Sequence, residues 1–458
     1  MDPIDPVHGT GVLLAIALAA VVLLLVLIIR VKLHAFVALV LVSLLTAVAT
    51  GIPLVDVPTA LTSGFGSTLA SVALLVGFGV MIGRLLEASG GAQVLADTLV
   101  SRFGERRAPL ALGVAAFLFG LPIFFDAGLV VFLPIVLTVA RRFGGSVLVY
   151  ALPAAGAFAA THALLPPHPG PVAAGTVMGG DLGVVLLVNL PIAVVSWYVG
   201  VYLFSRWVGS RVHVDVPTLL LGEEQDGGDD STPPPVALVL SILLVPLVLI
   251  GLNTVLTTLV AGGTLAEGHA WVDALVLVGT TPVALLLTLL LAIGTLGRRG
   301  RSLAETGALL DASLGPVCSV ILITGAGGML GGVLRTSGVG AALTESLGGL
   351  GVPLLLQAFL LAAALRVAQG SATVALTTAS GLVAAQTADL SDVQVALLVT
   401  AVAAGATVLS HVNDSGFWLV SRFFGLDVRT TLRTWTVMET TLGLSALALA
   451  AVAYPLVA

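Results

Sequence analysis

The stretch GFGVMIGRLLEASGGAQVLADTL, Gly77 to Leu99, occurs a second time in the chain as GAGGMLGGVLRTSGVGAALTESL, Gly325 to Leu347. The two copies share nine identities in 23 positions at an offset of 248 residues. A second pair of stretches, AGAFAATH (Ala155 to His162) and AGATVLSH (Ala404 to His411), follows at an offset of 249. Self-similarity at a fixed offset indicates an internal repeat. We therefore expect two related halves.

The composition places both halves in a membrane. Of the 458 residues, 58% are hydrophobic and only 9% are charged, which is outside the range of soluble globular proteins. The net charge of -6 owes much to one acidic loop and predicts no nucleic-acid partner. The single cysteine, Cys318, can form no internal disulfide. The sequence is therefore that of an all-α protein that crosses the lipid bilayer several times.

The membrane spans follow from apolar runs of about 20 residues. Clusters of Arg and Lys flank most of these runs, and such clusters mark the cytoplasmic side. About ten full spans, with both termini outside, place every cluster in the cytoplasm and leave over Arg84, Arg335 and Arg366. The predicted spans are 10–30, 33–51, 69–88, 183–205, 235–260, 271–296, 317–335 and 430–455, with interrupted spans at 147–180 and 393–421.

Two segments of 35 residues, 108–142 and 352–386, are too long for one span and too short for two. We expect each to be a re-entrant helical hairpin that enters and leaves the membrane on one side. Their tips lie near GLPIFFDAG (Gly120 to Gly128) and RVAQGSATV (Arg366 to Val374). Non-helical backbone at membrane depth is tolerated only inside protein or beside a wet cavity. The two tips therefore predict a cavity.

The two interrupted spans carry histidines at their breaks. THALLPPHPGP, Thr161 to Pro171, concentrates prolines that end a helix and remove backbone donors. The break contains His162 and His168, and the corresponding break of the second copy contains His411. Interrupted helices near the bilayer midplane build substrate sites in secondary transporters. The backbone is therefore expected to break in order to form a polar site inside the membrane.

The two copies start on opposite sides of the membrane, which makes them inverted-topology repeats, a design common among secondary transporters. The first repeat covers 1–213, with the hairpin 108–142 and the broken helix 147–180. The second covers 236–458, with the hairpin 352–386 and the broken helix 393–421. Between them, 214–235 is expected to be an acidic, solvated cytoplasmic linker.

Four segments resemble signature stretches of the gluconate permease family of proton symporters, part of the ion transporter superfamily. They are LPIFFDAGLVVFLPIV, HALLPPHPGPVAAG, LRVAQGSATVALTTASG and LSHVNDSGFWLVSRFFGLDVRTTLRTWTVMET, and the similarity runs from about Leu33 to the C-terminus. The resemblance implies proton-coupled uptake of gluconate or a related small hydroxy or amino acid anion. It further implies a homodimer in the bacterial inner membrane, in which a transport domain of hairpins and broken helices slides against a scaffold, as in an elevator.

The polar residues of the tips and breaks are the predicted site. A charged Asp126 would cost about 2.5–3.5 kcal/mol on insertion scales, so it carries the coupling proton, organises the site, or caps the hairpin as a structural acceptor. Arg366 offers a planar fork that suits a carboxylate, supplied by the substrate, Asp126 or Asp414. The predicted proton-coupling residues are Asp126, His162, His411 and Asp414; the predicted substrate-binding residues are Arg366, Gln369, Gly370, Ser371, Thr373, Thr161, His168, Ser410, Asn413, Asp414 and Ser415.

Several alternatives remain open at this point. The histidines could equally be structural, and Glu439 is expected to be a structural partner of Arg433 or of a neighbouring helix. No HExxH, GxSxG or GxGD motif occurs, so an enzyme is not expected. Neither a cofactor nor a metal site is predicted, and the coupling ion is H⁺, with Na⁺ the main alternative. Sodium-coupled transport of a carboxylate or a D-amino acid is the second hypothesis, and an anion channel is the third.

Overall fold

The computed structural model describes residues 7–91, 94, 98, 104–121, 124–166, 168–217, 233–261, 265, 268–339, 342, 346 and 352–457. These residues form helices joined by short connections, and no β-strand occurs among them. Most of the predicted linker 214–235 lies outside the described residues. The helices of the first half are α1 Thr10–Leu25, η1 Val26–Arg30, α2 Ala35–Ala49, α3 Val57–Ala88, η2 Glu105–Arg107, α5 Ala108–Gly120, α6 Phe125–Phe143, α7 Leu148–Leu164, α8 Pro169–Val177, α9 Leu182–Ser196, η3 Trp197–Leu203 and α10 Phe204–Gly209.

The second half is helical in the same way. Its helices are α11 Val236–Ala261, α12 Ala270–Gly279, α13 Thr281–Ala292, η4 Ile293–Gly297, α14 Leu303–Thr336, α16 Leu354–Gln369, α17 Ala372–Val383, η5 Ala384–Gln386, α18 Asp392–Thr407, α19 Ser415–Phe423, α20 Val428–Thr431, η6 Leu432–Thr436, α21 Val437–Ala453 and η7 Tyr454–Leu456.

Six helical stretches of the described chain are long and apolar enough to cross a membrane, and the bent pair α12 and α13 to η4 makes a seventh. Further apolar helices of 10–17 residues, among them α2, α5, α16, α17 and α18, pack around them. Many large apolar side chains are exposed on the outer helices, for example Leu187 at 73% and Val248 at 62%. A lipid environment covers such surface without cost. The chain is therefore a helical membrane protein.

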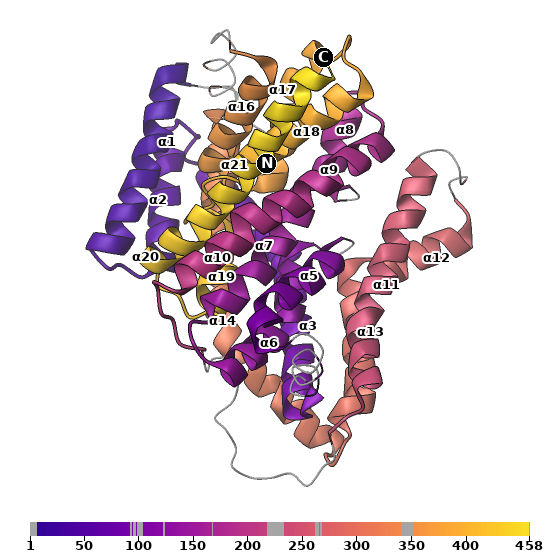
Figure 1. Cartoon of the computed structure of the whole chain (residues 1–458). Coiled ribbons are helices and arrows are strands. Elements are labelled where there is room, and N and C mark those ends of the chain that lie inside the picture. The colour runs from indigo at the N-terminus through magenta and orange to yellow at the C-terminus, as the bar shows by residue number, and fades with distance from the viewer. Residues whose placement is uncertain are drawn as a thin grey trace.

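The helices form a central bundle with a smaller group of helices on each side (Figure 1). Helices α1 and α2 stand at one edge, and α11 to α13 stand at the other. Between them, α3 packs along α14, the helix that carries the matching copy of the repeat. A Cβ added at Gly332 would lie 2.8 Å from the Cα of Gly64, so the two backbones touch. Small residues at such a contact let membrane helices approach closely.

Three of the predicted spans differ from the helices that the structure shows. Helix α3 begins at Val57 rather than near 69, and α14 begins at Leu303 rather than near 317. The Ser302 hydroxyl and the Glu305 carboxylate form a capping box that starts α14. The single span predicted at 271–296 is wrong in shape, because α12 and α13 meet at 70°. Thr280 has extended backbone there, and Pro282 opens the next helix.

The chain breaks where the sequence predicts it. In the first half, α5 ends at Gly120 and α6 begins at Phe125, while α7 and α8 are separated at residues 165–168. In the second half, α16 gives way to α17 at Gly370 and Ser371, and α18 and α19 are separated at 408–414. Helix α5 contacts α6, and α16 contacts α17. The centre of the first tip, residues 122 and 123, and Pro167 lie outside the described residues.

The pieces of the two halves interleave. Helix α17 of the second half packs against α8 of the first, and α6 of the first half packs against α19 of the second. Each two-helix unit therefore lies beside the broken helix of the opposite half. This exchange brings all four breaks into one region of the bundle.

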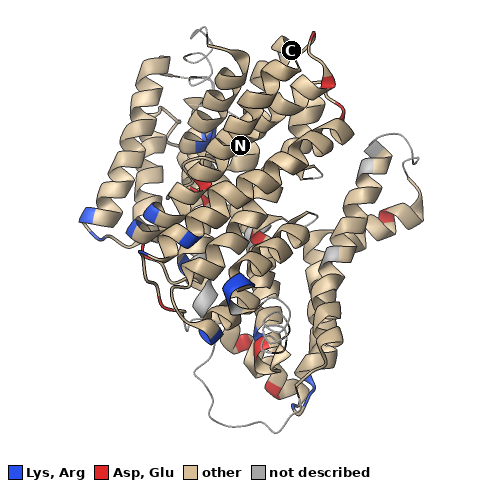
Figure 2. Ribbon diagram, viewed as in Figure 1, with Lys and Arg blue, Asp and Glu red and all other residues tan. Residues whose placement is uncertain are grey.

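Lys and Arg lie mostly in the lower half of the view, at the ends of helices (Figure 2). The C-terminus lies at the opposite, upper end (Figure 1). A concentration of basic residues on one side is what the positive-inside rule associates with the cytoplasmic face.

Candidate functional site

A cavity of about 760 Å³ opens where the four breaks meet. Its volume is within the range of about 300–1,000 Å³ typical of sites for small molecules. Ten of the predicted site residues line it: Asp126, His162, Arg366, Gln369, Gly370, Ser371, Thr373, Asn413, Asp414 and Ser415. The other four, Thr161, His168, Ser410 and His411, lie outside its lining.

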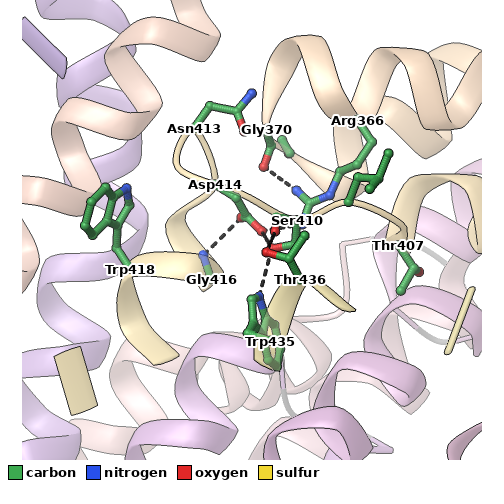
Figure 3. Close-up of polar contacts among 12 residues, drawn as sticks. Arg366, Gly370, Thr407, Ser410, Asn413, Asp414, Gly416, Trp418, Trp435 and Thr436 are labelled. Carbon is green, nitrogen blue, oxygen red and sulfur yellow. Dashed lines mark hydrogen bonds and ion pairs between the residues drawn. The ribbon is translucent and has the colours of Figure 1, made fainter. Parts of the chain in front are cut away.

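The centre of the site is a buried ion pair. The Arg366 guanidinium donates to the carboxylate of Asp414 and to the carbonyl oxygen of Gly370 (Figure 3). Both side chains are buried, with Arg366 4% and Asp414 6% exposed. Of the partners considered for Arg366, the structure therefore selects Asp414. A buried charge requires such a partner, because an unpaired charge away from water is very costly.

Asp414 is held on three sides. Besides Arg366, its carboxylate accepts a hydrogen bond from the Ser410 hydroxyl and one of 3.0 Å from the backbone N–H of Gly416, at the start of α19. The indole Nε1 of Trp435 donates to the Ser410 oxygen at 2.8 Å (Figure 3). Ser410 thus acts behind Asp414 and does not face the cavity, which differs from its predicted role in binding substrate.

The backbone of the second tip explains its Gly and Ser residues. Gly370 ends α16 in the left-handed region, with φ +77°, which glycine adopts without steric cost. A Cβ there would also lie 2.2 Å from the carbonyl oxygen of Asn413. The Ser371 hydroxyl then caps α17 by accepting from the N–H of Val374 at 3.3 Å. The Asn413 amide donates to the carbonyl of Val367 at 2.8 Å. The second break is thereby tied to the second tip.

Asp126 lies in the first turn of α6 and faces the cavity. Its side chain is partly buried, and no hydrogen bond or ion pair holds the carboxyl among the residues that the structure describes. Phe124 and Phe125 line the cavity beside it, and the ring of Phe125 lies 5.6 Å from that of Trp435. Asp126 is therefore a carboxyl group without a counter-charge in direct contact, in an apolar corner of the site.

The three predicted histidines lie in different surroundings. His162 lines the cavity, and its ring lies 5.0 Å from that of His168 and 5.9 Å from that of Phe124. His168 is buried, and its Nε2 donates to the carbonyl of Gly120 at 2.8 Å, which ties the first broken helix to the first tip. His411 is buried beside the second break. Only His162 can therefore meet a molecule in the cavity directly.

Thr161 has a packing role instead of the predicted contact with substrate. Its hydroxyl donates to the carbonyls of Ala157 and Phe158 in its own helix, at 3.1 and 3.0 Å. A Cβ at Gly120 would lie 2.4 Å from this hydroxyl, so the side chain fills the contact between α5 and α7.

Several buried polar atoms that border the cavity have no hydrogen-bond partner. They are Nε of Arg366, Oε1 of Gln369, Oδ1 of Asn413, Nδ1 of His162 and Oε1 of Glu439. Buried polar groups are nearly always paired, and an unpaired one in a native structure calls for an explanation such as a ligand or a bound water. Because each of these atoms is itself almost fully buried, it can reach a molecule in the cavity only if its side chain turns.

Part of the lining consists of residues that the sequence patterns do not predict. Glu439 of α21 borders the cavity, and no ion pair with Arg433 holds it among the described residues. Trp435, Thr407 and Arg335 line it as well. The bend between α12 and α13 adds Thr280, Thr281 and Asn253 of α11. An isolated ionisable residue inside a span is a signal of function by default, and it was present at Glu439. The described residues hold no group of three or more His, Cys, Asp or Glu side chains that could bind a metal ion.

The sequence model of the family described as GntP family permease matches residues 12–456. The chain belongs to this family. Among its relatives, the inner membrane permease YgbN of Escherichia coli K12 is 39% identical over 94% of this chain and 96% of its own. The gluconate permease of Pseudomonas aeruginosa is 37% identical over 94% and 95%. The Gnt-II system L-idonate transporter of Escherichia coli K12 is 36% identical over 95% and 97%.

This member of the GntP family is thus a membrane transport protein and not an enzyme, since the family and its relatives are permeases and transporters. The solved structure of the Alcanivorax borkumensis YdaH transporter has a weaker likeness, with 16% identity and a TM-score of 0.44 over 92% of this chain and 98% of that one.

Proposed function

We propose that the protein takes up gluconate or a closely related sugar acid together with protons. The observation that carries this proposal is the cavity at the four breaks, which is lined by the carboxyl group of Asp126 and by polar side chains such as Gln369, Thr373 and Ser415. Relatives at 34–37% identity are named gluconate permeases and gluconate transporters.

The hydrogen-bonding atoms fit a hydroxy acid. The backbone N–H groups at the start of α17, beside the cavity, can donate to a carboxylate. The side-chain amides of Gln369 and Asn413 belong to the lining, and an amide can both donate to and accept from hydroxyl groups. The hydroxyls of Thr373 and Ser415 in the lining can do either. A carboxylate followed by a chain of hydroxyls satisfies this set.

The charges favour coupling to protons. Arg366 is already neutralised by Asp414, so an incoming anion meets Asp126 without a spare buried cation in contact with it. Two negative charges in a low-dielectric site repel each other strongly. Protonation of Asp126 removes this repulsion and lowers the net charge that crosses the membrane. Among the predicted proton carriers, Asp126 is therefore favoured over Asp414, which is held by its ion pair.

The movement we propose is alternating access of the elevator type. The two halves act as inverted-topology repeats, with the units 108–142 and 352–386 as re-entrant hairpins and both termini outside. The hairpins and broken helices carry the substrate, and the remaining helices form a scaffold through which two protomers pair in the bacterial inner membrane. The interleaving of each hairpin with the opposite broken helix supports their movement as one unit.

Uptake of radiolabelled gluconate into proteoliposomes tests the function. With sodium replaced by potassium throughout, an inward proton gradient is expected to drive accumulation, and a protonophore to abolish it. Accumulation that needs sodium and ignores the proton gradient would contradict the proposal. Linear uptake that does not saturate and shows no counterflow would point to a channel instead.

A further inference from the structure

Glu439 is a carboxyl group in the cavity that the proposed mechanism has not used. It is the third residue of α21 and borders the cavity together with Trp435 of η6. Its side chain is only 4% exposed, and its Oε1 has no hydrogen-bond partner. No ion pair reaches it among the described residues. A buried carboxylate without a partner is costly, so the group is either protonated or close to a charge that changes during transport.

The charged groups near Glu439 are those of the substrate site. Arg366 and Asp414 are close enough to act on it electrostatically, with opposite signs. The elements packed against α21 carry the following other charged or titratable groups: Tyr150 and His162 on α7, Asp392 on α18 with His411 beside it, Tyr198 and Tyr202 of η3, Arg206 of α10, Arg433 of η6 and Tyr454 of η7. Arg206 and Arg433 are exposed to solvent. None of these groups forms an ion pair that would hold Glu439 in its charged form.

The summed charge of the groups that line the cavity indicates a role for Glu439. Two arginines line it, the buried Arg366 and the exposed Arg335, against three carboxyl groups, Asp126, Asp414 and Glu439. With every group ionised, a bound monovalent anion leaves the site with a net charge of about -2. With Asp126 and Glu439 both protonated, the same loaded site is neutral. A neutral loaded site crosses the low-dielectric part of the membrane at the lowest cost.

We propose that Glu439 is a second proton-carrying residue, so that two protons accompany each monovalent hydroxy acid anion, one on Asp126 and one on Glu439. This inference rests on the proposed function and extends it. Both carboxyl groups take up protons on the side where the anion binds, and both release them on the side where it leaves. The net charge moved in each cycle is then positive, and uptake responds to the membrane potential.

The number of protons can be measured as a balance point. Proteoliposomes are loaded with gluconate, given a pH gradient of one unit, and held at zero potential with potassium and valinomycin. The gluconate gradient at which net flux vanishes is then determined. One pH unit corresponds to about a tenfold concentration ratio for each coupled proton. The expected balance is a gluconate ratio of about 100-fold for the wild type and about 10-fold for Glu439→Gln.

Two further variants make the result specific. Glu439→Asp keeps a titratable group and is expected to stay near 100-fold. Ser445→Ala, on the same helix and away from the cavity, removes only a hydrogen bond to Thr441 and is expected to behave like the wild type. If Glu439→Gln fails to fold, as judged by thermal unfolding in detergent, Glu439→Asp decides, and a folded Glu439→Asp protein at 10-fold contradicts the proposal.

The outcomes separate the two proposals. If Glu439→Gln reaches zero net flux at the same gluconate ratio as the wild type, whether that ratio is about 100-fold or about 10-fold, Glu439 carries no proton. Proton-coupled uptake is not contradicted by that result. A wild type that shows no proton-driven movement of gluconate contradicts the proposed function itself, and with it the second proton.

Discussion

The guanidinium of Arg366 joins the carbonyl oxygen of Gly370 to the carboxylate of Asp414, and so ties the second tip to the second broken helix (Figure 3). Arg366 and Asp414 are 48 positions apart in the chain, and both are almost fully buried. Because the pair is neutral as a whole, it stabilises the lining of the cavity and adds no net charge to the site.

Removal of either partner of this pair is expected to destabilise the protein by about 3–5 kcal/mol, because the other charge is left buried and unpaired. The variants Arg366→Met and Asp414→Asn test this, with the free energy of unfolding measured in detergent. The double variant is expected to lose about as much as one single variant, since no charge remains unpaired. Losses that simply add would show that the two side chains do not stabilise each other.

Asp126→Asn is expected to weaken the response to the proton gradient, because one of the two proposed proton carriers is lost. The amide keeps the shape of the side chain and its place in the cavity but can no longer exchange a proton. Proton-driven accumulation in vesicles is expected to fall by about tenfold or more for each pH unit of driving gradient. Asp273→Asn in the exposed part of α12 is the matched control. Full accumulation with normal pH dependence in Asp126→Asn would rule out this role.

Gly370→Ala is expected to abolish transport. A side chain at this position is strained by about 1–2 kcal/mol in the left-handed region, and it would collide with the carbonyl oxygen of Asn413 at 2.2 Å. Gly381→Ala in the same two-helix unit is the control, since a Cβ there meets nothing within 4 Å. Uptake rates of purified variants in vesicles check the contrast. Equal rates for the two variants would mean that the tip is not held in this shape.

The membrane location and the four chain breaks can be predicted from sequence, because each depends on local patterns of apolar, Gly and Pro residues. Two proline-containing stretches differ in how clearly they predict a break. The prolines of THALLPPHPGP, around His168, predict one, whereas Thr280 to Pro282 lies inside an apolar run that predicts a continuous span, and α12 and α13 meet there at 70°.

The partners of side chains could not be predicted in the same way. Arg366 had two possible carboxylates in the sequence, Asp126 and Asp414, besides that of a substrate, and only the folded structure pairs it with Asp414. Which residues line the cavity and which only support the lining also depends on packing in the folded protein. Ser410 and His168 lie at the breaks as expected, yet their side chains turn toward Asp414 and Gly120. Glu439 lies far along the chain from both tips, and only the fold brings it to the cavity.

The central claim is that the anion binds in the cavity at the four breaks, and protection of a single cysteine tests it most directly. Because Cys318 is the only cysteine, Cys318→Ala provides a cysteine-free background in which Thr373→Cys places one thiol in the lining. Labelling by a water-soluble maleimide in detergent is expected to proceed, and gluconate is expected to slow it. Ser210→Cys, exposed at the end of α10, should label at a rate that gluconate does not change. A Thr373→Cys protein that labels equally fast with and without saturating gluconate would contradict the account.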